Sequence, residues 1–176
     1  MTTELLAPAG GQEALVAAVQ SGADAVYMGF GAFNARRSAR NFSDEEFRAA
    51  VSYCHLRGVK VYLTLNTLVT DRELPALAAE ARTASECGVD AILVQDWGVL
   101  ATLQKIIPDM PLHASTQMNV RGKRGIELAA RLGCSRVTLA RELSIEKVAE
   151  LAELGVDLEV FVHGALCICQ SGQCLL

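Results

Sequence analysis

Short apolar runs alternate with amphipathic stretches along the chain, and a glycine commonly precedes each run. The segments SGADAVYMGF, RGVKVYLTLN, CGVDAILVQD, LGCSRVTLAR and LGVDLEVFVHG all show this pattern. Runs that are apolar at nearly every position are typical of strands in a parallel sheet that is covered on both faces. Between them, residues 43–57 and 73–87 have apolar residues at three- and four-residue spacings, which predicts helices.

The ends of these helices also have local signals. Ser43 and Glu46 have the spacing of a capping box, in which each residue binds a backbone N–H of the other, so a helix should begin there. The glycine that follows each helix is expected to adopt the left-handed conformation that turns the chain into the next strand.

The pattern predicts seven strands, at residues 4–8, 25–30, 61–66, 91–96, 112–117, 136–141 and 158–164. A (β/α)₈ barrel has eight strands and typically about 250 residues. We therefore expect an incomplete TIM-type α/β barrel that lacks its eighth strand, forming a single domain over residues 1–176. An open doubly wound sheet is the alternative.

Composition narrows the class of protein further. Half of the 176 residues are apolar and a fifth are charged, which is typical of a folded α/β protein. The net charge of −4 argues against a broad electrostatic grip on nucleic acid, although a local basic patch could still bind it. No apolar run approaches the roughly 20 residues of a membrane span, and the N-terminus lacks the features of a secretory signal. These features predict a cytoplasmic protein.

Polar residues follow several of the predicted strands, at the edge where parallel α/β folds collect their chemistry. They are Asn66, Gln95, Asp96, Gln117, Asn119, Arg141, Glu142 and His163. Long amides and charged groups in these places favour a ligand pocket. The alternative is that loops, which begin where strands end, are simply polar.

A cluster of arginines lies in the loop after the second predicted strand. Arg36, Arg37 and Arg40 could bind a phosphate or a carboxylate, because guanidinium groups bind such anions through two parallel hydrogen bonds. They could equally balance the acidic residues at 44–46. Arg141 and a second basic run at residues 121–124 could extend an anion-binding surface.

The six cysteines fall into two groups. Cys54, Cys87 and Cys134 are scattered through or beside predicted helices, where isolated cysteines act as small hydrophobic residues. The other three are concentrated near the C-terminus, at positions 167, 169 and 174.

The chemistry of this second group stays open on spacing alone. The C-x-C-x₄-C spacing does not match a zinc knuckle. An iron–sulfur cluster normally needs four thiolates, and this segment has three at most. His163, four residues before Cys167, could form a nucleophilic dyad with it, although nothing in the sequence orients the imidazole.

A family resemblance adds to this picture. The segment EVFVHGALCICQSGQCLL closely resembles the signature of peptidase family U32, the collagenase-like proteases, with Cys167 and Cys174 in register with its two cysteines. The segments ELLAPAG, GADAVYMG, FNARRSARNF and HASTQMN also resemble the N-terminal half of that family. The resemblance therefore spans essentially the whole chain.

The resemblance implies an activity that the family's name does not describe. Members of this family take part in oxygen-independent hydroxylation of ribosomal RNA, of tRNA or of ubiquinone precursors, with a 4Fe–4S cluster held by four cysteines. Cys167 and Cys174 match the first two of these ligands, and Cys169 lies outside the signature. Two ligands are then absent from the chain, so we expect it to be the N-terminal part of a larger barrel and to bind no intact cluster by itself.

Three hypotheses follow. The leading one is part of an iron–sulfur-dependent hydroxylase that acts on RNA or a small anionic substrate, with Asn66, Gln117, Glu142 and His163 lining the pocket. The second is a peptidase with Cys167 as nucleophile and His163 as base. The third is a non-catalytic binding or assembly module. An incomplete barrel would also expose sheet edges, which favours self-association.

Overall fold

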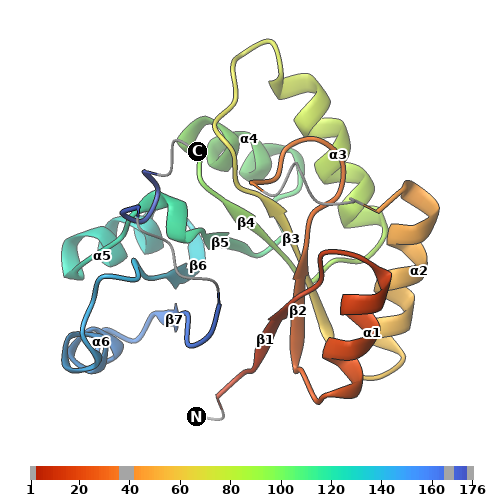
Figure 1. Cartoon of the computed structure of the whole chain (residues 1–176). Coiled ribbons are helices and arrows are strands. Elements are labelled where there is room, and N and C mark those ends of the chain that lie inside the picture. The colour runs from red at the N-terminus through yellow and green to blue at the C-terminus, as the bar shows by residue number, and fades with distance from the viewer. Residues whose placement is uncertain (1–2, 36–41, 165–168, 174–176) are drawn as a thin grey trace. The chain divides into compact units, whose positions relative to one another are not determined.

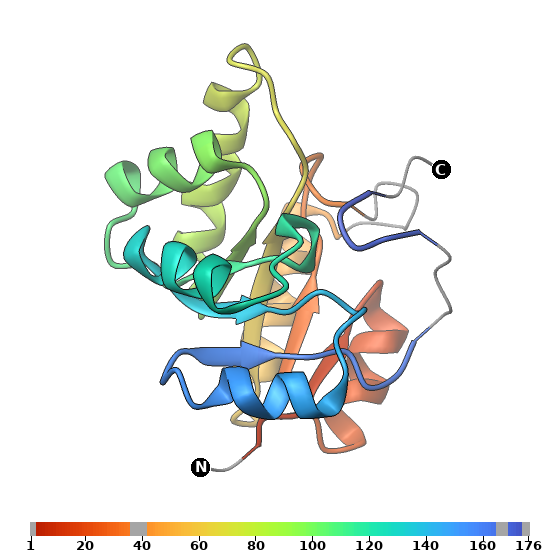
Figure 2. The ribbon, with the colours of Figure 1, turned by 90° about the vertical axis from the view of Figure 1, so that its left-hand side faces the viewer.

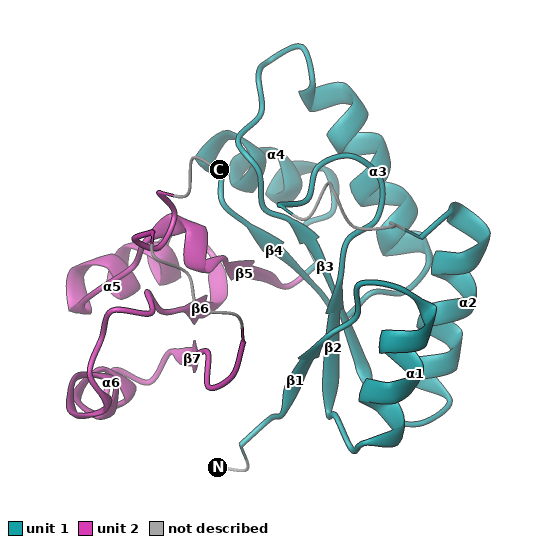
Figure 3. Ribbon diagram, viewed as in Figure 1, with its two compact units in different colours: residues 1–110 teal, residues 111–176 magenta. Residues whose placement is uncertain are grey.

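The computed structural model describes residues 3–35, 42–164 and 169–173 (Figure 1). The chain divides into two compact units, residues 1–110 and residues 111–176, which Figure 3 shows in different colours. The single domain expected for residues 1–176 stays a prediction. Among the described residues, no helix combines the length and the hydropathy that crossing a lipid bilayer requires.

The first unit alternates strands and helices, and its strands pair in parallel and in chain order. Its elements are β1 (Leu6–Pro8), α1 (Gln12–Gln20), β2 (Ala25–Met28), α2 (Asp44–His55), β3 (Lys60–Leu65), α3 (Leu74–Glu86), β4 (Ala91–Val94) and α4 (Trp97–Ile106). The order of these elements is the one that the hydrophobic pattern predicts.

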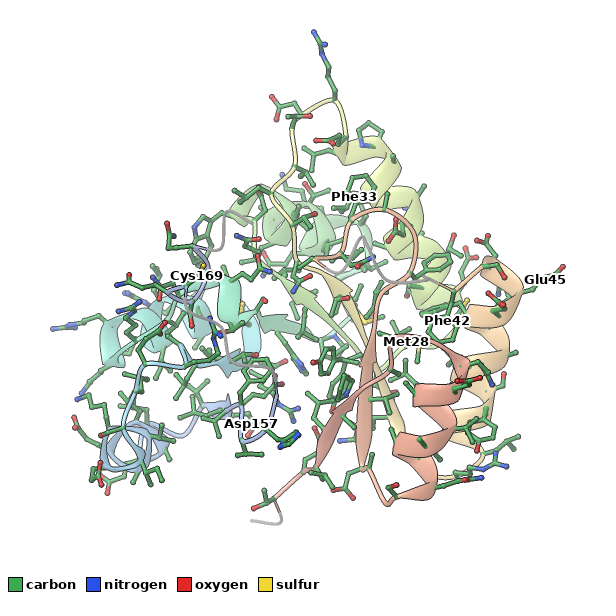
Figure 4. The ribbon with its side chains drawn as sticks, in the orientation of Figure 1. Met28, Phe33, Phe42, Glu45, Asp157 and Cys169 are labelled. Atoms are coloured by element: carbon green, nitrogen blue, oxygen red, sulfur yellow. The ribbon has the colours of Figure 1, made fainter. Side chains whose placement is uncertain are left out.

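One face of β3 is fully buried. Val61, Leu63 and Leu65 alternate along β3 and have no exposed surface. Helix α2 contacts β3 and buries Phe47, which stacks on Phe30 with ring centroids 4.6 Å apart. Figure 4 labels Met28 and Phe42, two further buried residues of this unit. This packing fixes the strands and therefore the loops that leave their carboxyl ends.

The second unit repeats the pattern with shorter strands. Its elements are β5 (Leu112–Ala114), the 3₁₀ helix η1 (Thr116–Met118), α5 (Lys123–Arg131), β6 (Cys134–Thr138), α6 (Ile145–Ala152) and β7 (Asp157–Glu159). β5 pairs with β6, and β6 with β7, all in parallel. Figures 1 and 2, seen from two directions, both show α6 beside β7.

The predicted local signals are confirmed. Ser43 is the N-cap of α2, its hydroxyl accepts from the N–H of Glu46, and the Glu46 carboxylate accepts from the N–H of Ser43. The glycines after α2 and α3, Gly58 and Gly88, have φ angles of 71° and 86°. Glycine reaches this left-handed region without the steric cost that a side chain adds, so each helix can end and turn into the next strand.

Most of the strands are shorter than the ranges predicted, and for two of them the structure shows the reason. The strand predicted at residues 112–117 ends at Ala114, because Ser115 caps η1 with its hydroxyl and diverts the chain into a 3₁₀ turn. The strand predicted at residues 158–164 ends at Glu159. The apolar residues that follow it, Val160, Phe161 and Val162, are exposed, so no burial holds them in a sheet.

Candidate functional site

The second unit gathers polar groups around residues 169–173, which lie between the two cysteines of the signature and which we call segment 169–173. Ser171 lies at its centre and is 1% exposed although it is polar. Figure 4 labels Cys169, the first residue of the segment. Cys167 and Cys174, the predicted metal ligands, lie outside the described residues.

Arg141, in the turn that follows β6, binds this segment in three ways. Its backbone N–H donates to Oγ of Ser171 at 3.1 Å, and its Nε donates to the same oxygen at 3.3 Å. Its Nη2 donates to the carbonyl oxygen of Cys169 at 3.2 Å. The guanidinium group thus holds the backbone of the segment, and its predicted role as an anion contact stays a prediction.

Glu142 binds Ser171 from the neighbouring position. One carboxylate oxygen, Oε1, accepts from the backbone N–H of Ser171 at 2.7 Å, and the other lies 3.7 Å from Nη2 of Arg121. Desolvation raises the pKa of Glu142, but the hydrogen bonds from Ser171 and the charge of Arg121 outweigh it and hold the pKa below 4.5. The carboxylate is therefore ionised at neutral pH.

Arg121 links this carboxylate to the turn after η1. Its Nε donates to Oδ1 of Asn119 at 2.7 Å, and its Nη2 lies 3.5 Å from Oε1 of Gln170. Asn119 has a φ of 55°, a conformation that asparagine tolerates better than most residues. The basic run at residues 121–124 thus contributes at least one side chain to the signature segment.

Gln117 approaches the segment through its backbone. A Cβ atom placed on Gly172 would collide with the carbonyl oxygen of Gln117, and Gly172 has a φ of 74°. Both facts require a glycine at this position. The structure therefore brings Gln117, Arg141 and Glu142 together around segment 169–173, while the predicted catalytic roles of Gln117 and Glu142 stay predictions.

Asn66 lies in the first unit, directly after β3, and anchors the loop that leads to the arginine cluster. Its Oδ1 accepts from the N–H of Ala35 at 3.1 Å. Glu80 on α3 supports the same loop, because its Oε2 accepts from the N–H of Ala32 at 3.2 Å. The predicted anion contacts Arg36, Arg37 and Arg40 lie outside the described residues, which resume at Phe42.

Glu80 is a group that the sequence analysis missed. Desolvation raises its pKa to about 7, against the lowering effect of the Ala32 hydrogen bond, and the charge of Asp44 adds a smaller increase. Its second oxygen, Oε1, is buried and has no hydrogen-bond partner among the described residues. The only signal in the sequence was a glutamate between alanines of an amphipathic helix, and that pattern is common on solvated faces.

Asp96, after β4, and Asn34, in the loop after β2, form hydrogen bonds with nearby backbone groups. Asp96 is the N-cap of α4, where its Oδ1 accepts from the N–H groups of Gly98 and Val99 at 2.6 and 3.1 Å. Asn34 is fully buried and donates to the carbonyl of Gly31. Their polar atoms satisfy the hydrogen-bonding capacity of nearby backbone N–H and carbonyl groups.

His163 is exposed and follows β7 by four residues. In the part of the chain that the structure describes, no carboxylate forms a hydrogen bond with its ring. Its predicted partner, Cys167, lies outside the described residues, so the geometry of a thiol–imidazole pair stays a prediction.

Two of the three dispersed cysteines lie in the core, as expected. Cys54 and Cys134 are buried, and desolvation raises the pKa of each thiol to about 11. Cys87 is half-buried and its pKa is also raised, first by desolvation. Such thiols stay protonated at neutral pH and are poor metal ligands. Among the described residues, no group of three or more His, Cys, Asp or Glu could hold a metal ion.

Comparison with solved structures defines the fold. The U32 peptidase Mk0906 superimposes with a TM-score of 0.69 at 19% identity, over 90% of this chain and 67% of that chain. A putative copper homeostasis protein CutC from Streptococcus agalactiae gives a TM-score of 0.68 at 15% identity, over 90% of this chain and 87% of that one. These likenesses confirm the predicted class, an α/β fold of the incomplete TIM-barrel type.

Sequence comparison then gives the family. The model of peptidase family U32 matches residues 10–176, so the chain belongs to this family. It is 35% identical to tRNA hydroxylation protein P1 of Bacillus subtilis, over 98% of this chain and 41% of the relative. It is 38% identical to the 23S rRNA 5-hydroxycytidine C2501 synthase of Escherichia coli, over 98% of this chain and 26% of that protein.

One relative that matches this chain is named for a different activity, proteolysis of collagen. The chain is 34% identical to a collagenase of Porphyromonas gingivalis, over 98% of this chain and 44% of the relative. The chain therefore spans less than half the length of each of these three proteins.

Proposed function

We propose that this chain is part of an enzyme that hydroxylates a base in RNA without molecular oxygen. The observation behind the proposal is the match of nearly the whole chain to proteins named for tRNA and 23S rRNA hydroxylation, at 34–38% identity. A cytoplasmic location is part of this proposal, since RNA modification of this kind takes place there.

The chemistry of this reaction demands a redox partner. Replacing a C–H bond of a base by C–OH removes two electrons from the base. Without O₂, these electrons must pass either to an acceptor while water supplies the oxygen, or to an oxygen-bearing donor that is reduced in the same step. A 4Fe–4S cluster, when bound, supplies one-electron chemistry for such a reaction.

We propose Cys167 and Cys174 as two of the four ligands of this cluster. Thiolates are the ligands that iron–sulfur clusters take, and the segment between the two cysteines is attached to the carboxyl end of β6 in the second unit. The buried thiols of Cys54 and Cys134 have raised pKa values and do not compete for this role. Cys169 serves as the natural control.

The roles proposed for the other polar residues follow from their places. Arg36, Arg37 and Arg40 would bind RNA phosphates, because the loop that precedes them is fixed by Asn66 and Glu80. His163, exposed after β7, would contact the base. Glu142 and Gln117, which contact segment 169–173, would line the substrate pocket beside it.

The test is the modification state of cellular RNA in a deletion strain. Mass spectrometry should show that one nucleoside lacks an oxygen atom, and the full-length gene should restore it. Cys167→Ala and Cys174→Ala should fail to restore it, while Cys169→Ser should succeed. Anaerobically purified wild-type protein should contain iron and sulfide. Unchanged RNA in the deletion strain would contradict the proposed substrate.

The collagenase among the relatives makes a peptidase the second candidate. In that case Cys167 would be the nucleophile and His163 its base, and both Cys167→Ala and His163→Ala would abolish gelatin cleavage while RNA stayed fully modified. Because no carboxylate among the described residues hydrogen-bonds to His163, the orienting group of a usual triad has no candidate here.

Self-association is a further proposal for this chain. β7 is followed by Val160, Phe161 and Val162, which are 42, 48 and 85% exposed. Exposed apolar residues next to a strand favour pairing with another chain. Sedimentation velocity of residues 1–176 should show dimers or larger species, and Phe161→Asp should reduce them.

A further inference from the structure

Segment 169–173 is attached to the turn after β6 by two adjacent residues of opposite charge. We propose that Arg141 and Glu142 are positioning residues, which fix this segment so that the cysteines on either side of it are presented to one iron–sulfur cluster. The inference rests on the proposed function. It assigns to Arg141 and Glu142 the role of holding the segment in place, without contact with the substrate.

The geometry makes Ser171 the point of attachment. Its hydroxyl oxygen accepts from the N–H and from Nε of Arg141 at 3.1 and 3.3 Å, and its own N–H donates to Glu142 at 2.7 Å. Both the side chain and the backbone of Ser171 are thus engaged, and the residue is 1% exposed. Hydrogen bonds that involve an ionised partner are shorter and roughly twice as strong as neutral ones.

Further contacts restrain the segment on either side of Ser171. Arg121 lies 3.7 Å from the second oxygen of Glu142 and also reaches Gln170. Gly172 packs directly against the backbone carbonyl of Gln117, with no room for a side chain. A segment that is anchored at Ser171 and in close contact at Gly172 cannot slide or rotate without breaking these interactions.

The attachment matters because of where the cysteines lie in the sequence. Gln173 is bonded directly to Cys174, and Cys169 is two residues after Cys167. Because residues 169–173 are joined to both cysteines through the backbone, fixing these residues would restrain both thiolates. A segment ordered in advance loses little conformational entropy when it binds its ligand, which favours retention of the metal.

The charges of Arg141 and Glu142 should also change the reduction potential of the cluster. The reduction potential of an iron–sulfur cluster depends on the surrounding charge and on hydrogen bonds to its sulfur atoms. Removing the negative charge of Glu142 should stabilise the more negative, reduced cluster and raise its midpoint potential. A residue that contributed only to folding would leave the potential of the surviving holoprotein unchanged.

The experiment uses the full-length protein, purified without oxygen, as wild type, Glu142→Ala, Glu142→Gln and Arg141→Ala. Glu150→Ala is the matched control, because Glu150 is an exposed glutamate of the same unit whose partner among the described residues is Lys147 on its own helix. Three quantities are measured: hydrogen exchange of a peptide that contains residues 169–173, the rate of iron transfer to a ferrous chelator, and the midpoint potential.

We expect Glu142→Ala and Arg141→Ala to accelerate both exchange and iron transfer by about tenfold, the effect of losing one strong hydrogen bond. Glu142→Gln keeps an acceptor oxygen, so it should retain most of the attachment while raising the potential. Glu150→Ala should match the wild type in all three measurements. Ser171→Ala is the second test of the attachment if Glu142→Ala does not fold.

The outcomes separate this inference from the function on which it rests. A wild-type protein without iron overturns both. An iron-loaded wild type, with Arg141 and Glu142 variants that transfer iron at the wild-type rate, overturns the positioning role alone. Faster exchange of the segment without faster iron transfer has the same consequence, because the attachment would then be structural only.

Discussion

The carboxylate of Glu142 accepts a 2.7 Å hydrogen bond from the backbone N–H of Ser171, a residue 29 positions further along the chain. This contact joins the turn after β6 to the middle of the cysteine signature. Because its acceptor is ionised and its donor is buried, the state of the carboxylate controls how firmly the segment is held.

The first prediction concerns the pH dependence of this contact. The folded pKa of Glu142 lies below 4.5, so the contact stabilises the structure above pH 4.5 and is lost as the pH falls through the folded pKa. The amide NMR signal of Ser171 should therefore titrate with a midpoint below 4.5. Glu142→Gln should remove this titration, and a midpoint above 4.5 would contradict the assignment.

Gly172→Ala is the second prediction. The added methyl group meets the carbonyl oxygen of Gln117, and the φ of 74° is unfavourable for alanine, so the segment should detach at a cost of about 1–3 kcal/mol. Hydrogen exchange of residues 169–173 should accelerate. Gly10→Ala is the control, because nothing lies within 4 Å of the added atom and no positive φ restricts it.

The third prediction uses the raised pKa of Glu80. Its pKa is 4.5 in the unfolded chain and about 7 in the folded protein, so the folded state binds the proton more tightly between these values. Stability should consequently fall as the pH rises from 4.5 to 7, by roughly 1–2 kcal/mol after allowance for solvent screening.

Glu80→Gln should remove this fall, since glutamine keeps an acceptor for the Ala32 N–H and cannot ionise. Urea unfolding at pH 5 and at pH 8 provides the measurement. The exposed Glu13 on α1 gives the matched control, Glu13→Gln, which should retain the pH dependence of the wild type. Equal pH dependence in wild type and Glu80→Gln would refute the prediction.

The fourth prediction concerns the N-cap of α4. Asp96→Ala removes the acceptor of the Gly98 and Val99 N–H groups and should destabilise the protein by about 1 kcal/mol, which lowers Tm by about 2–4 °C. Calorimetry can measure this difference. Asp109→Ala, at an exposed position after α4, should leave Tm within about 1 °C of the wild type.

Predictions that rest on residues close together in the sequence agree best with the structure. The Ser43–Glu46 capping box and the glycine turns after α2 and α3 depend on residues a few positions apart, and all were confirmed. The strand predicted at 112–117 was too long because the capping hydroxyl of Ser115 competes with β-structure. An apolar pattern does not reveal that competition.

Polar residues at the carboxyl ends of strands were found by their position, but their partners were not. Asp96 caps a helix and Asn66 anchors a loop, although both were grouped with residues expected to line a pocket. Ser171 lies within the cysteine signature, but its residue type and neighbours do not indicate that it is an attachment point. Its importance comes from burial, and a serine followed by glycine usually indicates an exposed turn.

By itself, the sequence determined the alternation of strands and helices, the class of fold and membership of the U32 family, because periodicity, caps and short motifs are properties of neighbouring residues. Only the tertiary structure decided that Arg141 and Glu142 hold Ser171, and that Glu80 is a desolvated carboxyl behind a loop. These relationships join residues about 30 to 50 positions apart, and they exist only after parallel strands have paired in register and brought their carboxyl ends together.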